Sequence, residues 1–165
     1  MKKNTKIISA YPCCGKTYVT ENTTELFRDE DYIPKVIDSD FSKFSWIIKE
    51  DGTKERNSEF PDNYIQHIKD NIGKVDFIFV SSHKEVREAL ARNNIKFTIV
   101  VPEKNLLTDW MIKMYDRGND NDFIDNQINN WDKWLTEIDE EKNTYSRIIK
   151  LKKHEYLSDV IKKHL

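Results

Sequence analysis

The stretch Lys6-Ile7-Ile8-Ser9-Ala10-Tyr11-Pro12-Cys13-Cys14-Gly15-Lys16-Thr17 decides the fold of this chain. Its first five residues form a short apolar run that predicts a buried strand, and residues 16–27 have helical character. Similar apolar runs recur at residues 35–37, 75–81, 97–101 and 146–151, with helical stretches between them. Continuous apolar runs joined by helices are typical of parallel strands covered on both faces. The sequence therefore predicts an α/β fold of three layers, α/β/α, around a five-stranded parallel sheet.

The composition limits the class of protein. With 165 residues, 38% hydrophobic and 34% charged, the chain has the size and apolar content of one globular domain, expected to span residues 1–165. The formal net charge of −2 gives no general basic surface, so binding to nucleic acid is not favoured. No apolar run approaches the roughly 20 residues of a membrane span, and the two cysteines are adjacent rather than spaced as in a disulfide framework. We expect a cytoplasmic protein without a membrane partner.

Residues 10–17 match the Walker A pattern of a phosphate-binding loop in spacing and in context, with Ala10 in place of the first glycine. In such a loop, backbone N–H groups converge on phosphate oxygens, and a glycine allows close approach. The residues expected to bind ATP or GTP are Pro12, Cys13, Cys14, Gly15, Lys16 and Thr17. Lys16 is expected to reach the β and γ phosphates as a catalytic residue, and the hydroxyl of Thr17 to bind Mg²⁺.

The two cysteines of this loop also raise a metal or redox interpretation. Cys13 and Cys14 are adjacent, and adjacent thiols lack the separated spacing of a zinc site. We interpret both as ordinary loop residues of the phosphate site.

Polar residues follow the second and third expected strands. In parallel sheets, ligands bind beyond the carboxyl ends of the strands, which makes these residues candidates for the site. Asp38 and Asp40 are expected to activate or orient an acceptor hydroxyl as catalytic and substrate-binding residues, or to hold Mg²⁺ through water. Aspartates in such positions also cap turns. Ser82 and His83 follow the third strand, where an acidic Walker B residue is missing, and are expected to contact the substrate; His83 could instead cap a helix.

Aromatic and basic side chains complete the expected acceptor site. Phe41 and Trp46 follow Asp40 and are expected to stack against a base or to roof the acceptor pocket. Arg87 lies four residues after His83 on the same helical face, so the two could approach one anion together. The alternative for Arg87 is an ordinary solvated charge on a helix.

Two further segments are expected to lie around the site. The polar and irregular segment 41–60 predicts an excursion on the acceptor side. The segment 105–122 contains Lys113 and Arg117, an i, i+4 pair near the end of an expected helix, and predicts a lid. Both cations are expected to bind the ATP phosphates, with Arg117 stabilising the transferred phosphoryl group as a catalytic residue. The alternative is that they only complement the helix macrodipole.

The order of strand, phosphate loop, acidic pair and basic helix resembles the nucleoside monophosphate kinase-like branch of P-loop proteins, which includes adenylate and shikimate kinases. It is also similar to small P-loop proteins encoded by bacteriophages. The resemblance implies the strand order 2-3-1-4-5, an acceptor site over the second and third strands, and a lid after the fourth. It also implies that Asp38 and Asp40 face the acceptor, Arg87 its phosphate, and Arg117 the phosphates of ATP. The family often has two or more arginines in its lid, whereas this chain offers one arginine and Lys113.

The expected activity is ATP-dependent phosphotransfer to a nucleotide or nucleoside, with a deoxynucleoside monophosphate as the first choice and Mg²⁺ as the metal. One alternative is a kinase of hydroxymethylated bases in DNA, which the near-neutral charge disfavours. Another is a nucleotide-binding protein that regulates a host partner without catalysis. The choice between ATP and GTP and the oligomeric state stay open at this point.

Overall fold

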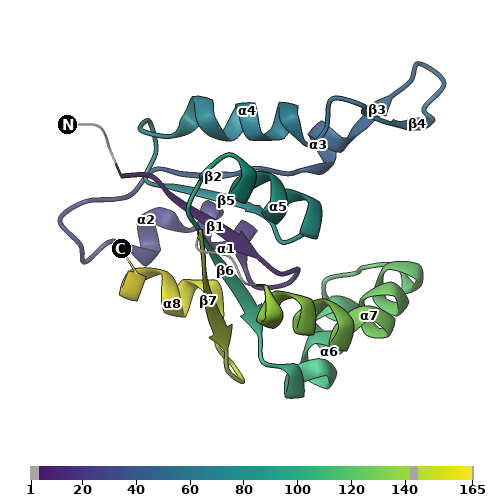
Figure 1. Ribbon diagram of the computed structural model, residues 1–165. Coiled ribbons are helices and arrows are strands. Elements are labelled where there is room, and N and C mark those ends of the chain that lie inside the picture. The colour runs from purple at the N-terminus through teal and green to yellow at the C-terminus, as the bar shows by residue number, and fades with distance from the viewer. Residues whose placement is uncertain (1–3, 142–144, 165) are drawn as a thin grey trace.

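Five parallel strands form the central sheet of the computed structural model, which describes residues 4–141 and 145–164 (Figure 1). The strands, in the order β2-β5-β1-β6-β7 across the sheet, are β2 (Val36–Asp38), β5 (Phe77–Ser81), β1 (Lys6–Ala10), β6 (Phe97–Pro102) and β7 (Ser146–Leu151). The predicted α/β class with a five-stranded parallel sheet is confirmed. Counted within this sheet alone, the neighbours run 2-3-1-4-5; the labels differ because β3 and β4, which were not expected, form a second sheet. Of the expected domain, residues 1–3, 142–144 and 165 lie outside the described residues.

The parallel register brings the carboxyl ends of neighbouring strands together. Ala10 at the end of β1 pairs with Ser81 of β5 and with Val100 of β6, while Asp38 at the end of β2 pairs with Phe79. Every residue of β5 is buried, as are the last four residues of β1. Burial on both faces explains why these strands read as continuous apolar runs. The residues that follow Ala10, Asp38 and Ser81 therefore emerge along one edge of the sheet.

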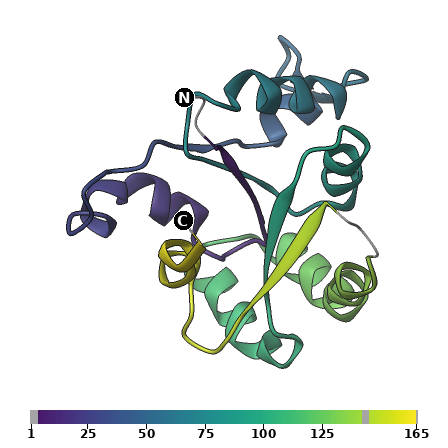
Figure 2. The same cartoon turned by 60° about the vertical axis from the view of Figure 1, so that its left-hand side comes forward.

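Helices connect the strands and cover the sheet. They are α1 (Lys16–Glu21), α2 (Thr23–Leu26), α4 (Asp62–Asn71), α5 (Lys84–Arg92), α6 (Leu107–Asp116), α7 (Asn121–Glu140) and α8 (Leu157–Ile161). Short 3₁₀ helices span Lys104–Leu106 and Lys162–His164. In Figure 2, α1, α2 and α8 lie on one side of the sheet, and α5 and α7 lie on the other. Among the described helices, none is both long enough and apolar enough to cross a membrane.

The segment 41–60 has more regular structure than the sequence indicates. Helix α3 (Ser42–Ser45) leads into an antiparallel hairpin of β3 (Trp46–Ile48) and β4 (Lys54–Arg56), with Gly52 at φ 82° in its turn. The hairpin projects away from the main sheet in Figure 1. The predicted excursion therefore contains a short helix and a hairpin that lie outside the main sheet. Each of the two strands has only three residues and every one is exposed, including the apolar residues of β3, so neither carries the longer pattern by which a strand is recognised in a sequence.

Two buried tryptophans tie the helices that follow β6 to the loop that follows β1. Trp110 of α6 donates from Nε1 to the carbonyl of Pro12 at 2.9 Å, and Trp131 of α7 donates to the carbonyl of Lys104 at 2.8 Å. The Trp131 ring also meets Tyr11 edge-on, with centroids 5.7 Å apart. Burying a large apolar side chain contributes roughly 1.5–3 kcal/mol. Packing as well as hydrogen bonding therefore holds the start of the loop in place.

Candidate functional site

The loop after β1 has the backbone conformation that its glycine permits. Gly15 has φ 98° and ψ 28°, a left-handed conformation that favours glycine. Cys13 is also left-handed, with φ 65°. Ala10 is a buried strand residue and is not among the described residues with positive φ. Alanine therefore stands in place of the first glycine of the pattern without backbone strain.

Neighbouring elements hold this loop through its carbonyl groups. The N–H of Leu157, at the start of α8, donates to the carbonyl of Cys14 at 2.8 Å, and Trp110 binds the carbonyl of Pro12. Helix α1 begins at Lys16 without a side-chain cap on its N–H groups. Because the first N–H groups of a helix have no acceptor within it, they are available to an anion bound over the loop.

Lys16 lies close to the loop and donates to the carbonyl of Ala10 at 3.1 Å. Its pKa is lowered, chiefly because burial disfavours the charged ammonium, and the charge of Arg117 acts in the same direction. The nearby Cys14 and Asp38 oppose this shift. An anion bound beside the ammonium would favour its charged form again, so the position suits a phosphate.

Thr17 and Asp38 provide two oxygen ligands beside Lys16. The Thr17 hydroxyl donates to Oδ2 of Asp38 across 3.5 Å. Mg²⁺ in proteins is usually bound by one or two carboxylates together with waters and substrate phosphates. Within residues 4–141 and 145–164, no group of three or more His, Cys, Asp or Glu side chains could hold a metal ion by itself. The Thr17 hydroxyl therefore fits a magnesium ion that arrives together with a triphosphate, and Asp38 is placed to contact that ion through water.

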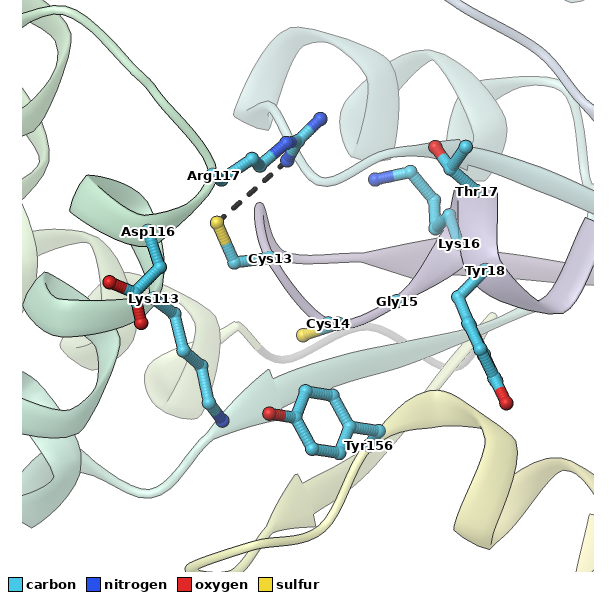
Figure 3. Close-up of a pocket in the computed structure, with 10 residues that line it drawn as sticks. All are labelled: Cys13, Cys14, Gly15, Lys16, Thr17, Tyr18, Lys113, Asp116, Arg117 and Tyr156. Atoms are coloured by element: carbon cyan, nitrogen blue, oxygen red, sulfur yellow. Dashed lines mark hydrogen bonds between the residues drawn. The ribbon is translucent and has the colours of Figure 1, made fainter.

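One side of the loop opens into a cavity of about 490 Å³, which we call the basic cavity (Figure 3). It is lined by Cys13, Cys14, Gly15, Lys16, Thr17, Tyr18, Lys113, Asp116, Arg117 and Tyr156. Three of these side chains are cationic and one is a carboxylate, so the cavity has an excess of positive charge that suits a polyphosphate. Lys113 and Arg117, which the sequence places in the expected lid, both lie here.

Lys113 is held by aromatic rings. Its Nζ atom is buried and has no hydrogen-bond partner in the part of the chain that the structure describes. It lies 3.7 Å from the centroid of Trp110 and 4.3 Å from that of Tyr156, toward which the side chain extends in Figure 3. Burial lowers the pKa of Lys113, against opposing effects from Cys14 and Asp109. Its N–H groups are therefore free to donate to a ligand in the basic cavity.

The two cysteines of the loop differ in their surroundings. Cys14 is buried, and burial raises its pKa to about 12, so its thiol stays protonated. Cys13 is partly exposed, and its sulfur lies 3.8 Å from Nη1 of Arg117 (Figure 3). Neither belongs to a metal-binding group of the described residues. Both are free thiols within the loop.

A second cavity, of about 340 Å³, begins where β1, β2 and β5 end, and we call it the acidic cavity. It is lined by Ala10, Pro12, Lys16, Thr17, Asp38, Ser39, Asp40, Phe41, Ser81, Ser82, His83, Arg117, Asn119 and Phe123. Burial is the main reason that the pKa of Asp38 is raised; Lys16 opposes the shift and Asp40 adds to it. A raised pKa makes a carboxylate a stronger base.

The two cavities meet at three residues. Lys16, Thr17 and Arg117 line both of them. The basic cavity adds the ammonium of Lys113, whereas the acidic cavity adds the carboxylates of Asp38 and Asp40. Ligands that occupied both cavities would therefore approach each other beside the shared lysine, threonine and arginine.

Most of the expected acceptor residues lie around the acidic cavity, namely Asp38, Asp40, Phe41, Ser82 and His83. Oδ1 of Asp40 accepts from the N–H of Ser42 at 3.0 Å and from its hydroxyl at 2.7 Å, so this aspartate also fixes the turn that leads into α3. The His83 ring lies against Phe41, with centroids 4.2 Å apart. Nδ1 of His83 is hydrogen-bonded to the hydroxyl of Ser81.

Two expected acceptor residues lie elsewhere. The guanidinium of Arg87 is buried, lies 2.8 Å from Oε2 of Glu141 and donates to the carbonyl of Ser82. It connects α5 to the end of α7 and lines neither cavity, which corrects the expectation that it contacts an acceptor phosphate. Trp46 lies in the exposed hairpin, where Arg56 sits 5.6 Å from its ring, and it does not line the acidic cavity. The expectation that it roofs the acceptor is corrected because β3 carries it away from the sheet edge.

Several other cavity residues were not predicted, and three of them bear on the ligand. Tyr156 lines the basic cavity just before α8, and Asn119 and Phe123 line the acidic cavity around the start of α7. The rule that ligands lie beyond the carboxyl ends of parallel strands applies to β7 as well, and would have drawn attention to Tyr156. For Asn119, the only signal is its place directly after Gly118, in the turn between two helices.

The chain matches no model of a known protein family, and comparison with curated proteins gives no significant match. Its function is therefore inferred from the site itself.

Proposed function

We propose that this protein is a phosphotransferase that moves the γ-phosphoryl group of ATP or GTP to a hydroxyl of a nucleotide or nucleoside. The observation that carries the proposal is the pair of cavities that share Lys16, Thr17 and Arg117, one with an excess of cations and the other with the carboxylates of Asp38 and Asp40. Phosphoryl transfer needs a donor and an acceptor aligned at one point, with cations around the group that moves. The three shared residues supply that point.

The basic cavity suits the donor. Backbone N–H groups around Gly15 and the ammonium of Lys16 would bind the β and γ phosphates. Lys113 adds a cation that has no acceptor among the described residues, and Tyr156 offers an aromatic face on which a purine base could stack. Mg²⁺, held by the triphosphate and by Thr17, with Asp38 near by, would neutralise charge on the transferred group.

The acidic cavity suits the acceptor. Its hydroxyl oxygen would attack the γ phosphorus, and the bond from that phosphorus to the bridging oxygen of the nucleoside diphosphate would break. The proton of the hydroxyl would pass to the carboxylate of Asp38, whose pKa is raised chiefly by burial. Arg117, which lines both cavities, would stabilise the charge on the phosphoryl group during transfer.

The wider fold agrees with this proposal. The strand neighbours match the order implied by the resemblance to nucleoside monophosphate kinases. A three-layer α/β/α arrangement and a lid formed by residues 105–122 belong to the same proposal. The position of Arg117 at the end of α6 suits the lid, because a short movement there would close both cavities together.

A transfer assay tests the proposal directly. Purified protein is incubated with Mg²⁺ and γ-labelled ATP or GTP, together with a panel of nucleosides and nucleotides. We expect label on at least one acceptor and its loss in Lys16→Ala and Asp38→Asn. The matched controls are Lys74→Ala and Asp70→Asn, which change exposed residues away from both cavities and should keep the activity.

Two other results would redirect the proposal. Label appearing only on DNA that contains hydroxymethylated bases would identify a kinase of modified DNA. Tight binding of a triphosphate without transfer to any acceptor would instead favour a non-catalytic nucleotide-binding regulator.

A further inference from the structure

The acidic cavity has no cation that belongs to it alone. Among its lining residues, which are all described, the only lysine and arginine are Lys16 and Arg117, and both also line the basic cavity. A bound triphosphate would occupy these two cations. A phosphate group on the acceptor would then face the carboxylates of Asp38 and Asp40 without a positive partner of its own.

Two arginines that act electrostatically on His83, Arg87 and Arg56, are already engaged elsewhere. Arg87 pairs with Glu141 at 2.8 Å and is buried. Arg56 pairs with Oε2 of Glu85 at 2.7 Å, and its guanidinium lies 4.9 Å from the centroid of Phe60. Neither lines the acidic cavity. Recruiting either to an acceptor phosphate would break an ion pair that the fold already contains.

His83 does not replace the missing cation. Its pKa lies below the ordinary value of 6.5, first because the ring is desolvated and second because Lys16 lies near by. Arg87 and Arg56 lower it further. The ring is therefore uncharged at neutral pH and gives the cavity an aromatic surface rather than a positive charge.

The charged side chains that this cavity does not share with the basic cavity are both carboxylates, whereas its serine hydroxyls can donate or accept. Asp38 and Asp40 present carboxylate oxygens. Oδ1 of Asn119 is buried, and none of the residues described donates a hydrogen bond to it. A buried acceptor without a donor is costly, so a ligand that brings O–H or N–H groups would be favoured here. A phosphate dianion brings only acceptor oxygens and is disfavoured.

Aromatic rings and size complete the description of the cavity. The Phe41 and His83 rings lie against each other with centroids 4.2 Å apart and planes tilted by 40°, and Phe123 lines the cavity from the start of α7. The volume of about 340 Å³ falls within the range of roughly 300–1,000 Å³ that is usual for small-molecule sites. A flat ring with hydroxyl groups matches both features.

From these observations we infer that the acceptor is an uncharged, hydroxyl-bearing ring compound of the nucleoside type, and not a nucleoside monophosphate. This inference rests on the proposed phosphotransferase function and replaces the monophosphate expected from the sequence. The reaction converts a nucleoside and a nucleoside triphosphate into a nucleoside monophosphate and a nucleoside diphosphate. The acceptor O–H bond breaks, its proton goes to Asp38, a new O–P bond forms, and the bond to the bridging oxygen of the donor breaks.

The test compares each nucleoside with its own 5′-monophosphate. Purified full-length protein receives Mg²⁺ and labelled ATP or GTP, and kcat/KM is measured for every member of each pair. We expect at least one nucleoside to exceed its monophosphate by about tenfold or more, a difference of about 1.4 kcal/mol. A preference for monophosphates, or equal use of both, would overturn the inference and leave the phosphotransferase proposal standing. If a triphosphate binds and neither partner is phosphorylated, both proposals fail.

A change of charge at Ser82 provides a second readout. Ser82 lines the acidic cavity and is partly exposed, so a longer side chain can extend toward the acceptor. Ser82→Lys supplies the missing cation, and Ser82→Gln is the uncharged control of similar length. We expect the ratio of monophosphate to nucleoside kcat/KM to rise about tenfold or more in the lysine variant relative to the glutamine variant. An unchanged ratio in two folded variants would contradict the inference, and if either variant fails to fold, the wild-type pairs decide it.

Discussion

The substitution Gly15→Ala distinguishes two hypotheses about the loop after β1: that its backbone binds phosphate, or that it only connects a strand to a helix. Gly15 has φ 98°, and an added Cβ would lie 3.8 Å from Cδ1 of Tyr156, which is an ordinary contact. The substitution therefore causes no steric clash. Its loss of folding stability comes from the left-handed backbone, which costs about 1–2 kcal/mol for a residue with a Cβ. For a protein of this size, each 1 kcal/mol lowers Tm by about 2–4 °C. We expect Gly15→Ala to melt about 2–8 °C below the wild type.

The same change should weaken nucleotide binding. Relief of the strain turns the peptide groups beside Gly15, and the loop loses the alignment of at least one N–H with a phosphate oxygen. A hydrogen bond to a charged acceptor is worth about 1.5–3 kcal/mol, so the Kd of the magnesium triphosphate should rise about 10- to 100-fold. Isothermal titration calorimetry at matched Mg²⁺ concentration measures this change, and thermal unfolding measures the loss of stability.

A second glycine gives a matched control. Gly52 has φ 82° with no atom within 4 Å of an added Cβ, and it lies in the turn of the exposed hairpin. Gly52→Ala should therefore lose a similar amount of stability without any change in triphosphate affinity. Wild-type affinity in Gly15→Ala, or an equal loss of affinity in both variants, would refute phosphate binding by the loop backbone.

Three further predictions concern other parts of the site. Asp38→Asn should lower kcat about 10²- to 10⁴-fold with little change in triphosphate affinity, and a variant with wild-type kcat would contradict the role of Asp38 as base. Because the pKa of Asp38 is raised, the kcat of the wild type should fall as the pH decreases through a value above the ordinary aspartate pKa of about 3.9. Tyr156→Ala should weaken triphosphate binding by about 1–3 kcal/mol in calorimetry, whereas Tyr156→Phe should bind like the wild type. Equal affinities in all three proteins would exclude stacking of the base on Tyr156. Arg87→Met should lower the free energy of urea unfolding by about 3–5 kcal/mol because it removes a buried guanidinium that binds Glu141 and the carbonyl of Ser82. The acceptor KM should not change, and a large rise in KM would restore Arg87 to the acceptor site.

The main sheet could be predicted from the sequence because its strands are buried on both faces. Phe77–Ser81, with every residue buried, reads as a continuous apolar run. The loop could be predicted because its glycine adopts a backbone conformation that other residues rarely do. The hairpin β3–β4 could not, since each strand has only three residues, all of them are exposed, and no core imposes a longer pattern on them.

The site was predicted in part for a related reason. Asp38 and His83 follow strands, and the register of a parallel sheet brings such residues together whatever the details of packing. The engagement of Arg87 depends on Glu141, which lies 54 residues further along the chain, and no local pattern indicates that contact. Asn119 enters the acidic cavity through the packing of α6 and α7, which is a tertiary feature.

The most direct test of a shared transfer point is a crystal structure with Mg²⁺ and a non-hydrolysable ATP or GTP analogue. We expect the γ phosphate within about 3 Å of the Lys16 ammonium, where the two cavities join, and the base in the basic cavity beside Tyr156. A triphosphate bound away from residues 12–17, or a base seated in the acidic cavity, would contradict the assignment of donor and acceptor sides.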